Sequence, residues 1–149
     1  MQKVLLAAGM FLILLVAACS KSDNAPAFDH YAQFLKDSAT IDNYLKTNSI
    51  TASHNPGSIF YKIIDSGKAD LKPNLQSNVT VAYTGTFLNG TKFDGNDNTS
   101  FDLNGVILGW QVGIPLIGEG GRIQLFLPSY FGYMNTGDRS GKIAPNTVI

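Results

Sequence analysis

The 149-residue sequence lacks a second cysteine and an excess of either charge. Because Cys19 is the only cysteine, no intramolecular disulfide can form. Lys and Arg number 11 and Asp and Glu number 11, so no long-range field favours nucleic acid or an acidic surface. The length suits one domain with one hydrophobic core. The net charge therefore indicates no class of binding partner, and we expect no nucleic-acid binding.

The sequence also lacks the residue sets of common catalytic and metal sites. Its two histidines, His30 and His54, precede the strand-rich part, and no carboxylate or thiol stands at metal-ligand spacing from them. No serine occupies a G-x-S-x-G elbow, and the glycines around Gly118 lack the lysine of a phosphate-binding loop. We therefore expect no metal, no cofactor and no covalent nucleophile, and interpret both histidines as solvated surface.

The first 18 residues are typical of a secretory signal. A basic start at Lys3 precedes an apolar run over 4–16 and small residues before Cys19. The run is shorter than the roughly 20 residues of a membrane-spanning helix. The sequence VAAC resembles the bacterial lipoprotein signal, in which the leader (1–18) is removed and the cysteine is acylated. We expect residues 19–27 to be a tether after lipidated Cys19, the alternative being a buried free thiol.

Residues 28–56 are predicted to be a helical segment. Apolar residues at helical spacing indicate one broad buried face: Phe28, Tyr31, Phe34, Leu35, Ile41 and Leu45. Ser38 and Asp42 interrupt this face, so one long helix and two shorter helices fit the pattern equally well. We interpret the segment as a helix packed on the following domain, with pairing to a second copy as the alternative. Pro56-Gly57 is predicted to end it.

Beyond residue 57 the sequence predicts a sheet. Segments with the branched, aromatic or alternating pattern of strands are 58–64, 79–84, 100–103 and 122–127. Asn89-Gly90 predicts a type I′ hairpin, which would fold 91–94 back beside the preceding strand. We expect a polar loop over 95–99 and one short helix within 106–117, since glycines and a proline limit its length.

Four short sequence motifs in this half have the order and spacing of a known family. They are VAYTG at 81–85, NGTKFD at 89–94, FDLNGVILGW at 101–110 and PSYFGY at 128–133. Together they resemble the FKBP-type peptidyl-prolyl cis-trans isomerases over about residues 57–149. The resemblance implies an α+β fold in which an antiparallel sheet wraps a short helix, preceded here by the helical segment. The leader and that segment resemble secreted lipoprotein members of Bacteroidetes-like bacteria.

The resemblance also implies a site. Trp110 would form the floor beneath the proline ring of a peptide, and Asp94 would supply the polar edge near the rotating imide. The hydroxyl of Tyr133 and the backbone N–H of Ile107 would bind peptide carbonyls. The walls would be Tyr83, Phe93, Val106, Ile107 and Ile143. The implied partners are proline-containing segments of exported proteins and macrolide inhibitors.

The implied activity is acceleration of X-Pro bond rotation (EC 5.2.1.8) in the cell envelope, with the lipid anchor in a membrane. Such an enzyme needs no nucleophile, because a dry apolar pocket favours the twisted amide, whose carbonyl is less polar than that of the planar form. Two other functions fit the same sequence. One is a non-catalytic peptide-binding chaperone, and the other is an interaction lipoprotein of an envelope complex.

The sequence departs from the family pattern at four places. A short loop after Gly95 leaves no counterpart for an arginine that often neighbours the aspartate, and Thr99 stands where an aromatic is common. Met134 and Ala144 replace a usual glycine and proline. Ile149 falls before an expected pocket phenylalanine and the final strand, so we expect a chain truncated before its last strand.

Overall fold

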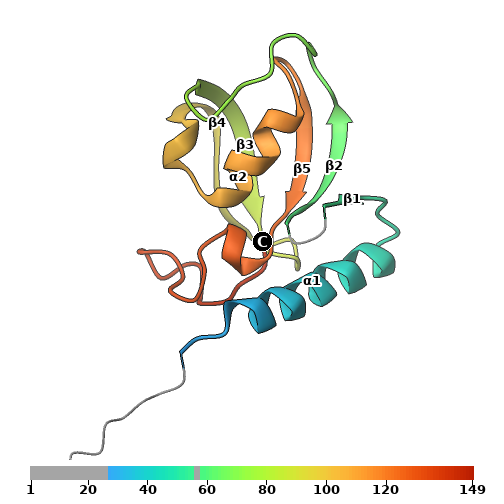
Figure 1. The fold of residues 1–149 in the computed structure, drawn as a ribbon, viewed down its shortest axis with the longest axis vertical. Helices are drawn as coiled ribbons and strands as arrows, with labels where there is room; N and C mark the ends of the chain where they lie inside the picture. The colour runs from blue at the N-terminus through green and yellow to red at the C-terminus, as the bar shows by residue number, and fades with distance from the viewer. Residues whose placement is uncertain (1–26, 56–57) are drawn as a thin grey trace, which may run out of the picture.

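A computed structural model describes residues 27–55 and 58–149. The predicted signal, Cys19 and nearly all of the tether therefore lie outside the described residues, as does Pro56-Gly57. The described part consists of a long helix, α1, lying against a strand-rich domain that contains a short helix, α2 (Figure 1). This is the predicted α+β arrangement of an antiparallel sheet around a short helix, preceded by a helix.

Helix α1 is one continuous helix, His30–Thr47. The Asp29 side chain caps its start by accepting a hydrogen bond from the N–H of Ala32 at 2.9 Å. Ser49, with φ 54°, follows its end in the left-handed conformation. The prediction that the helical segment reaches residue 56 was wrong, because the chain leaves the helix at Asn48 and continues into strand β1 (Ser53–His54).

The predicted broad apolar face of α1 was also wrong in its N-terminal half. The buried residues are Asp37, Ile41 and Leu45, which lie one turn apart and form a narrow stripe. Tyr31 is 70% exposed and Leu35 is 50% exposed. The most buried side chains of the helix therefore form one line, and that line includes a carboxylate.

The first sheet has the order β1-β2-β5, with β2 (Phe60–Asp65) antiparallel to both β1 and β5 (Arg122–Phe126). Phe60 and Phe126 stand opposite each other, and with Ile41 and Leu45 they form a hydrophobic core cluster. Helix α1 thus packs on the domain, as predicted, and this cluster of the core lies between the helix and the sheet.

The second sheet is a hairpin of β3 (Asn78–Thr86) and β4 (Lys92–Asp102). Its turn is not the predicted type I′ turn, because Gly90 (φ 83°) has a positive φ and Asn89 does not. The N–H of Gly90 donates to the carbonyl of Phe87, and the N–H of Phe87 donates to that of Thr91, both at 2.9 Å. These bonds define a three-residue loop in which Gly90 takes the left-handed position.

The predicted polar loop over 95–99 is instead a continuous part of β4. Val81 pairs with Thr99 and Tyr83 pairs with Asn96, so β4 contains one more residue than β3 over this interval. A β-bulge accommodates the extra residue without breaking the strand. Polar side chains are compatible with it because the exposed positions of a hairpin face water.

Helix α2 (Leu108–Gly113) continues into a 3-10 turn, η2 (Ile114–Leu116), as the sequence predicted for 106–117. Its two buried glycines allow close contact with β5 and the residue after it. A Cβ atom at Gly109 would lie 2.5 Å from the Leu127 side chain, and one at Gly113 would lie 2.6 Å from Leu125. Both glycines therefore let α2 lie close to the side chains of Leu125 and Leu127.

After β5 the chain forms a 3-10 turn, η3 (Ser129–Phe131), and then runs without regular structure to Ile149. Ile149 pairs with Leu127 through two backbone hydrogen bonds of 2.6 and 3.2 Å. Among the helices in the described ranges, none is both long and apolar enough to span a membrane.

Candidate functional site

Three aromatic rings from α2, β3 and β4 contact one another. The ring centroid of Trp110, on α2, lies 5.1 Å from that of Tyr83 on β3 and 5.6 Å from that of Phe101 on β4. The ring planes meet at 84° and 86°, the edge-to-face geometry that aromatic pairs favour. The rings are only partly buried. They form a rigid apolar surface that a flat ring could contact.

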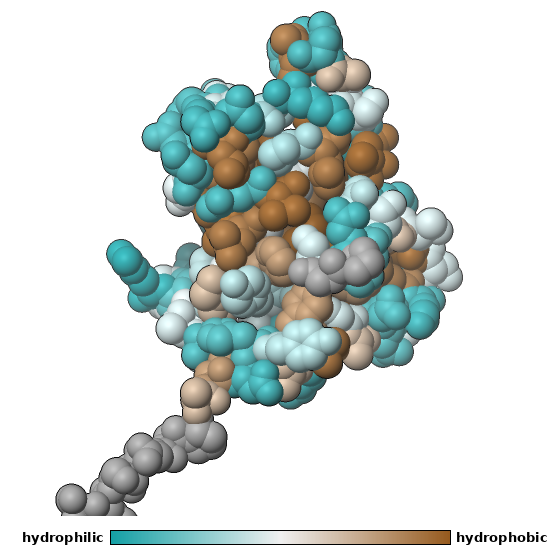
Figure 2. Space-filling model, in the orientation of Figure 1, coloured by the Kyte–Doolittle hydropathy of each residue, from teal (hydrophilic) through white to brown (hydrophobic). Residues whose placement is uncertain are grey.

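The surface around α2 is apolar as well. Figure 2 shows hydrophobic side chains gathered over the part of the molecule where Figure 1 places α2, between more hydrophilic margins. Val112 on this helix is among the exposed large hydrophobic residues. An exposed apolar surface rimmed by polar groups is typical of a ligand-binding region.

A carboxylate is fixed at the edge of the aromatic cluster. The hydroxyl of Tyr83 donates to Oδ2 of Asp94 at 2.7 Å, and the N–H of Gly95 donates to Oδ1 at 2.8 Å. These bonds, the Tyr83 bond most strongly, lower the pKa of Asp94, and the positive charges of Lys142 and Lys92 lower it further. The same hydrogen bond is the main cause that raises the pKa of Tyr83 to about 12. At neutral pH the pair is a neutral phenol donating to an ionised carboxylate.

Asp94 also borders a small hollow of about 180 Å³. Its lining residues come from β4 and the C-terminal segment: Phe93, Asp94, Tyr133, Asp138, Ser140, Lys142 and Ile143. The Phe93 ring lies across β3 at Gly85, where a Cβ atom would lie 2.5 Å from the ring. Burial is the main cause that raises the pKa of Tyr133, followed by the charges of Asp94 and Asp138. Its hydroxyl is therefore a neutral hydrogen-bonding group.

Asp138 shapes the rim of this hollow. Its carboxylate accepts hydrogen bonds from the N–H of Ile143 at 2.6 Å, from the N–H of Ser140 at 3.1 Å, and from the Ser140 hydroxyl. The hydroxyl bond is the largest cause of the lowered pKa of Asp138. The bonds close the loop and leave Ile143 only 3% exposed. Asp138 acts as a structural carboxylate, and its D-x-S spacing was the sequence signal for this turn.

The structure brings most of the predicted site residues into two adjoining groups. Tyr83 and Trp110 belong to the aromatic cluster, whereas Phe93, Tyr133 and Ile143 line the hollow, and Asp94 joins the two groups.

Two predicted wall residues lie at the start of α2. Ile107 is the N-cap, whose carbonyl accepts from the N–H of Trp110 at 3.0 Å, and the carbonyl of Val106 accepts from the Gln111 side chain at 2.8 Å. Neither lines the hollow beside Asp94.

Sequence reasoning assigned no role to Phe101, Asp138 or Lys142. Phe101 could have been found from strand alternation, because it stands two residues from Thr99 and opposite Val79. Lys142 lowers the pKa of Asp94 by its positive charge. That charge comes from the C-terminal loop, so a search near Asp94 in the sequence could not have found it.

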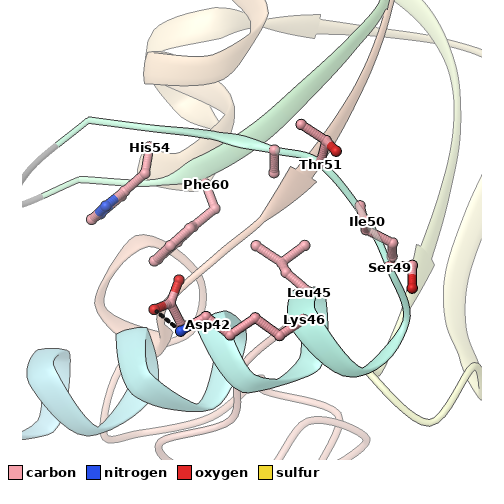
Figure 3. Close-up of a pocket in the computed structure, with 9 residues that line it drawn as sticks. Asp42, Leu45, Lys46, Ser49, Ile50, Thr51, His54 and Phe60 are labelled. Atoms are coloured by element: carbon pink, nitrogen blue, oxygen red, sulfur yellow. Dashed lines mark hydrogen bonds and ion pairs between the residues drawn. The ribbon is translucent and has the colours of Figure 1, made fainter.

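A larger hollow, of about 450 Å³, lies between the C-terminal half of α1 and the β1-β2 strands (Figure 3). Leu45 and Phe60 form its apolar side, and the His54 ring stacks on Phe60 with centroids 3.9 Å apart. Asp42 and Lys46 form an exposed ion pair of 3.3 Å at its edge. None of the predicted site residues lines it.

Both histidines are exposed, as the sequence predicted. Across residues 27–55 and 58–149, no group of three or more potential ligand side chains could hold a metal ion.

The chain is similar to known proteins of one family. Residues 69–149 match the family model described as "FKBP-type peptidyl-prolyl cis-trans isomerase". The chain is 37% identical over 100 residues to "Outer membrane protein MIP" of Legionella longbeachae, an alignment covering 63% of this chain and 41% of that protein. It is 33% identical over 120 residues to a probable FKBP-type peptidyl-prolyl cis-trans isomerase FkpA of Neisseria meningitidis, covering 78% of this chain and 40% of that protein.

A solved structure agrees with this likeness. The crystal structure of FkpA from Escherichia coli superposes with a TM-score of 0.66 at 29% identity, covering 78% of this chain and 58% of that chain. The chain spans about 40% of the length of the two curated relatives just described.

Proposed function

Because this chain belongs to the FKBP-type peptidyl-prolyl cis-trans isomerase family, we propose that it accelerates rotation about X-Pro bonds in exported proteins. The observation that supports this most is the hydrogen bond from Tyr83 to Asp94, which fixes a carboxylate beside the aromatic cluster of Trp110. An apolar surface for a proline ring and fixed polar groups for the flanking peptide are what this reaction requires.

The proposed mechanism uses binding energy alone. An X-Pro bond rotates slowly because twisting it destroys amide resonance, at a barrier of about 18–20 kcal/mol. The proline ring would rest on Trp110, whose surroundings favour the less polar twisted carbonyl. The Tyr133 hydroxyl and the Ile107 N–H would hold the peptide on either side of the bond. Lowering the barrier by about 5–6 kcal/mol would accelerate exchange roughly ten-thousand-fold.

Asp94 would act as a fixed negative charge, not as a proton donor. Its lowered pKa and the raised pKa of Tyr83 keep both groups in one protonation state through neutral pH. The hydrogen bonds from Tyr83 and Gly95 hold the carboxylate at the edge of the hollow, next to the proposed imide position. Preorganised groups of this kind stabilise a transition state without reorganising during the reaction.

The activity can be tested by NMR exchange spectroscopy on a short X-Pro peptide, whose cis and trans signals exchange slowly without catalyst. We expect the chain to accelerate exchange and Trp110→Ala to lose about a hundredfold or more of kcat/KM, equivalent to about 2.7 kcal/mol. Tyr31→Ala, on the exposed side of α1, is the matched control. No acceleration by the wild-type chain would overturn the activity, and an unaffected Trp110→Ala variant would overturn the site.

A non-catalytic chaperone that uses the same surface is the alternative supported by the exposed apolar surface around α2. It would suppress aggregation of an unfolded protein without changing X-Pro exchange. Measuring both properties on the same preparation separates the two functions. An interaction module of an envelope complex would instead capture its partner equally well with Trp110→Ala.

We further propose an envelope lipoprotein with residues 1–18 as signal, 19–27 as tether after acylated Cys19, 28–56 as the segment that contains helix α1, and 57–149 as isomerase domain. The VAAC sequence supports this division, and one similar protein bears the name outer membrane protein. In bacteria fed labelled palmitate, the full chain should acquire label and sediment with membranes, whereas Cys19→Ser should do neither. Label on the Cys19→Ser chain would contradict the proposal.

A further inference from the structure

Helix α1 is joined to the C-terminal part of the domain by a buried carboxylate. Asp37 is 2% exposed, and its Oδ2 accepts hydrogen bonds from the N–H of Ser129 at 2.8 Å and from the Ser129 hydroxyl at 2.5 Å. Its Oδ1 accepts from the side-chain amide of Gln33 at 2.6 Å. Burying a carboxylate is costly unless donors satisfy it, so these three donors belong to one arrangement.

Ser129 also makes hydrogen bonds to the residues on both sides of Tyr133. Its carbonyl accepts hydrogen bonds from the N–H of Gly132 at 3.0 Å and from the N–H of Met134 at 2.8 Å. These two residues are the immediate neighbours of Tyr133, and Met134 has a φ of 55°. The N–H and hydroxyl of Ser129 thus bind Asp37, while its carbonyl holds the chain on both sides of Tyr133.

Packing between α1 and the η3 turn reinforces the same link. Phe34 of α1 lies edge-on to Phe131, with ring centroids 6.3 Å apart, and His30 lies edge-on to Tyr130 at 5.9 Å. Ser129, at the start of the turn, is 2% exposed. The turn that leads to Tyr133 is therefore held by α1 through hydrogen bonds and through aromatic contacts.

We propose that Asp37 is a positioning residue for peptide binding, which fixes the Tyr133 hydroxyl in the small hollow through Ser129. The inference rests on the proposed function, since Tyr133 is its peptide-binding group. No residue of α1 lines the hollow, so the helix would act on the site indirectly, through this clamp of Asp37 and Ser129 and the aromatic contacts beside it. The helix would then be part of the binding apparatus and not only a cover for the core.

The test compares four variants of the full chain. Asp37→Ala removes the acceptor of both Ser129 bonds. Asp37→Asn keeps an acceptor for Ser129, because the Gln33 amide can reverse and offer its oxygen to the new NH₂ group. Asp42→Ala, on the same helix but exposed, is the control. Ser129→Ala removes only the hydroxyl bond and serves as a milder variant if Asp37→Ala does not fold.

The first readout is the NMR spectrum of ¹³C-labelled tyrosine rings, with the Tyr133 signal assigned from its absence in Tyr133→Phe. We expect Asp37→Ala to shift or broaden this signal, and Asp37→Asn and Asp42→Ala to leave it in place. An unchanged Tyr133 signal in Asp37→Ala would overturn the proposal. This readout needs no activity, so it decides the role of Asp37 even if the wild-type chain fails to accelerate X-Pro exchange.

The second readout is peptide kinetics in a double-mutant cycle with Tyr133→Phe. Asp37→Ala should lower kcat/KM about three- to tenfold, chiefly through KM, and Asp37→Asn should stay within about twofold of wild type. With Tyr133→Phe already present, Asp37→Ala should cost less than about a further twofold. Equal losses in both backgrounds would overturn the proposal, because they would show that Asp37 acts on general stability and not through Tyr133.

Discussion

The hollow beside Asp94 and the hollow between α1 and β1 both contain charged side chains, but they differ in how firmly those side chains are held. The first measures about 180 Å³ and the second about 450 Å³, yet the smaller one is the candidate site. In the smaller hollow, backbone N–H groups or side-chain hydroxyls hold the carboxylates of Asp94 and Asp138 in place. In the larger one the charges of Asp42 and Lys46 form an exposed pair, which contributes about 0–1 kcal/mol. Fixed polar groups, not volume, distinguish the site.

The largest loss of activity is expected when the aromatic wall of the smaller hollow is displaced. In Gly85→Ala the new Cβ would lie 2.5 Å from the Phe93 ring, which Phe87 flanks at a centroid distance of 5.1 Å. Overpacking of this kind destabilises the fold by about 1–3 kcal/mol. Because the Phe93 ring must leave its place in the wall of the hollow, we also expect kcat/KM on an X-Pro peptide to fall roughly ten- to a hundredfold.

Gly105→Ala is the matched control for this substitution, because a Cβ there meets no atom within 4 Å. Equal peptide kinetics for Gly85→Ala and the wild-type chain would show that the position of Phe93 does not matter for the site.

Removing the fixed charge should have the next largest effect. Asp94→Asn should lower kcat/KM about tenfold, because a charge-assisted hydrogen bond becomes a neutral one. The same change should lower the pKa of Tyr83 from about 12 towards its ordinary value, since Asp94 is the main cause of the increase. Ultraviolet titration of the tyrosines measures this shift.

Asp97→Asn, at an exposed position on the same strand, is the control for Asp94→Asn. A Tyr83 pKa that stays high in Asp94→Asn would contradict the assigned cause.

The pH dependence of X-Pro exchange is expected to change less than the activity does in the two preceding tests. With the pKa of Asp94 lowered and that of Tyr83 raised, we expect a flat profile across neutral pH. The stabilising bond between them is fully present above the unfolded-state pKa of the carboxyl group and is lost as pH falls through the lower folded-state pKa.

Lys142→Met should raise the pKa of Asp94 and move the acidic limb of this profile to higher pH, with less than about a threefold change at pH 7. An acidic limb that does not move would show that Lys142 does not act on Asp94.

The smallest effect is expected at the larger hollow. Lys46→Ala removes the ion pair with Asp42 and changes the edge of that hollow without touching the candidate site. We expect kcat/KM within about twofold of wild type and a similar thermal midpoint, measured by circular dichroism. A tenfold loss of peptide activity would mean that the larger hollow takes part in the reaction.

Local pattern was enough to predict the elements that position the site. Alternation predicted the strand containing Tyr83, and the spacing of the glycines and the proline predicted the short helix with Trp110. The hairpin loop was mistaken because Asn-Gly serves both a two-residue loop and the last two positions of a three-residue loop. The polar run after Asp94 was mistaken because its bulge depends on pairing with Val81 and Tyr83.

The contacts between distant parts of the chain could not be predicted from local sequence patterns. Asp37 and Ser129 are 92 positions apart in the sequence, and neither has a motif that points to the other. A carboxylate on the buried stripe of α1 contradicts the usual separation of apolar and polar faces, so periodicity predicted the buried face correctly at Ile41 and Leu45 and incorrectly in the N-terminal half. Such a pair becomes visible only when the helix is docked on the domain.

The clamp between Asp37 and Ser129 implies reciprocity between the helix and the peptide. Coupling free energy between two sites acts equally in both directions. If α1 holds Tyr133 ready for a peptide, a bound peptide must hold α1 on the domain by the same free energy. The amide protons of α1 should then exchange with solvent more slowly when the hollow is occupied, although no residue of α1 lines the hollow. The exchange rates of the α1 amides would therefore report whether the site is occupied.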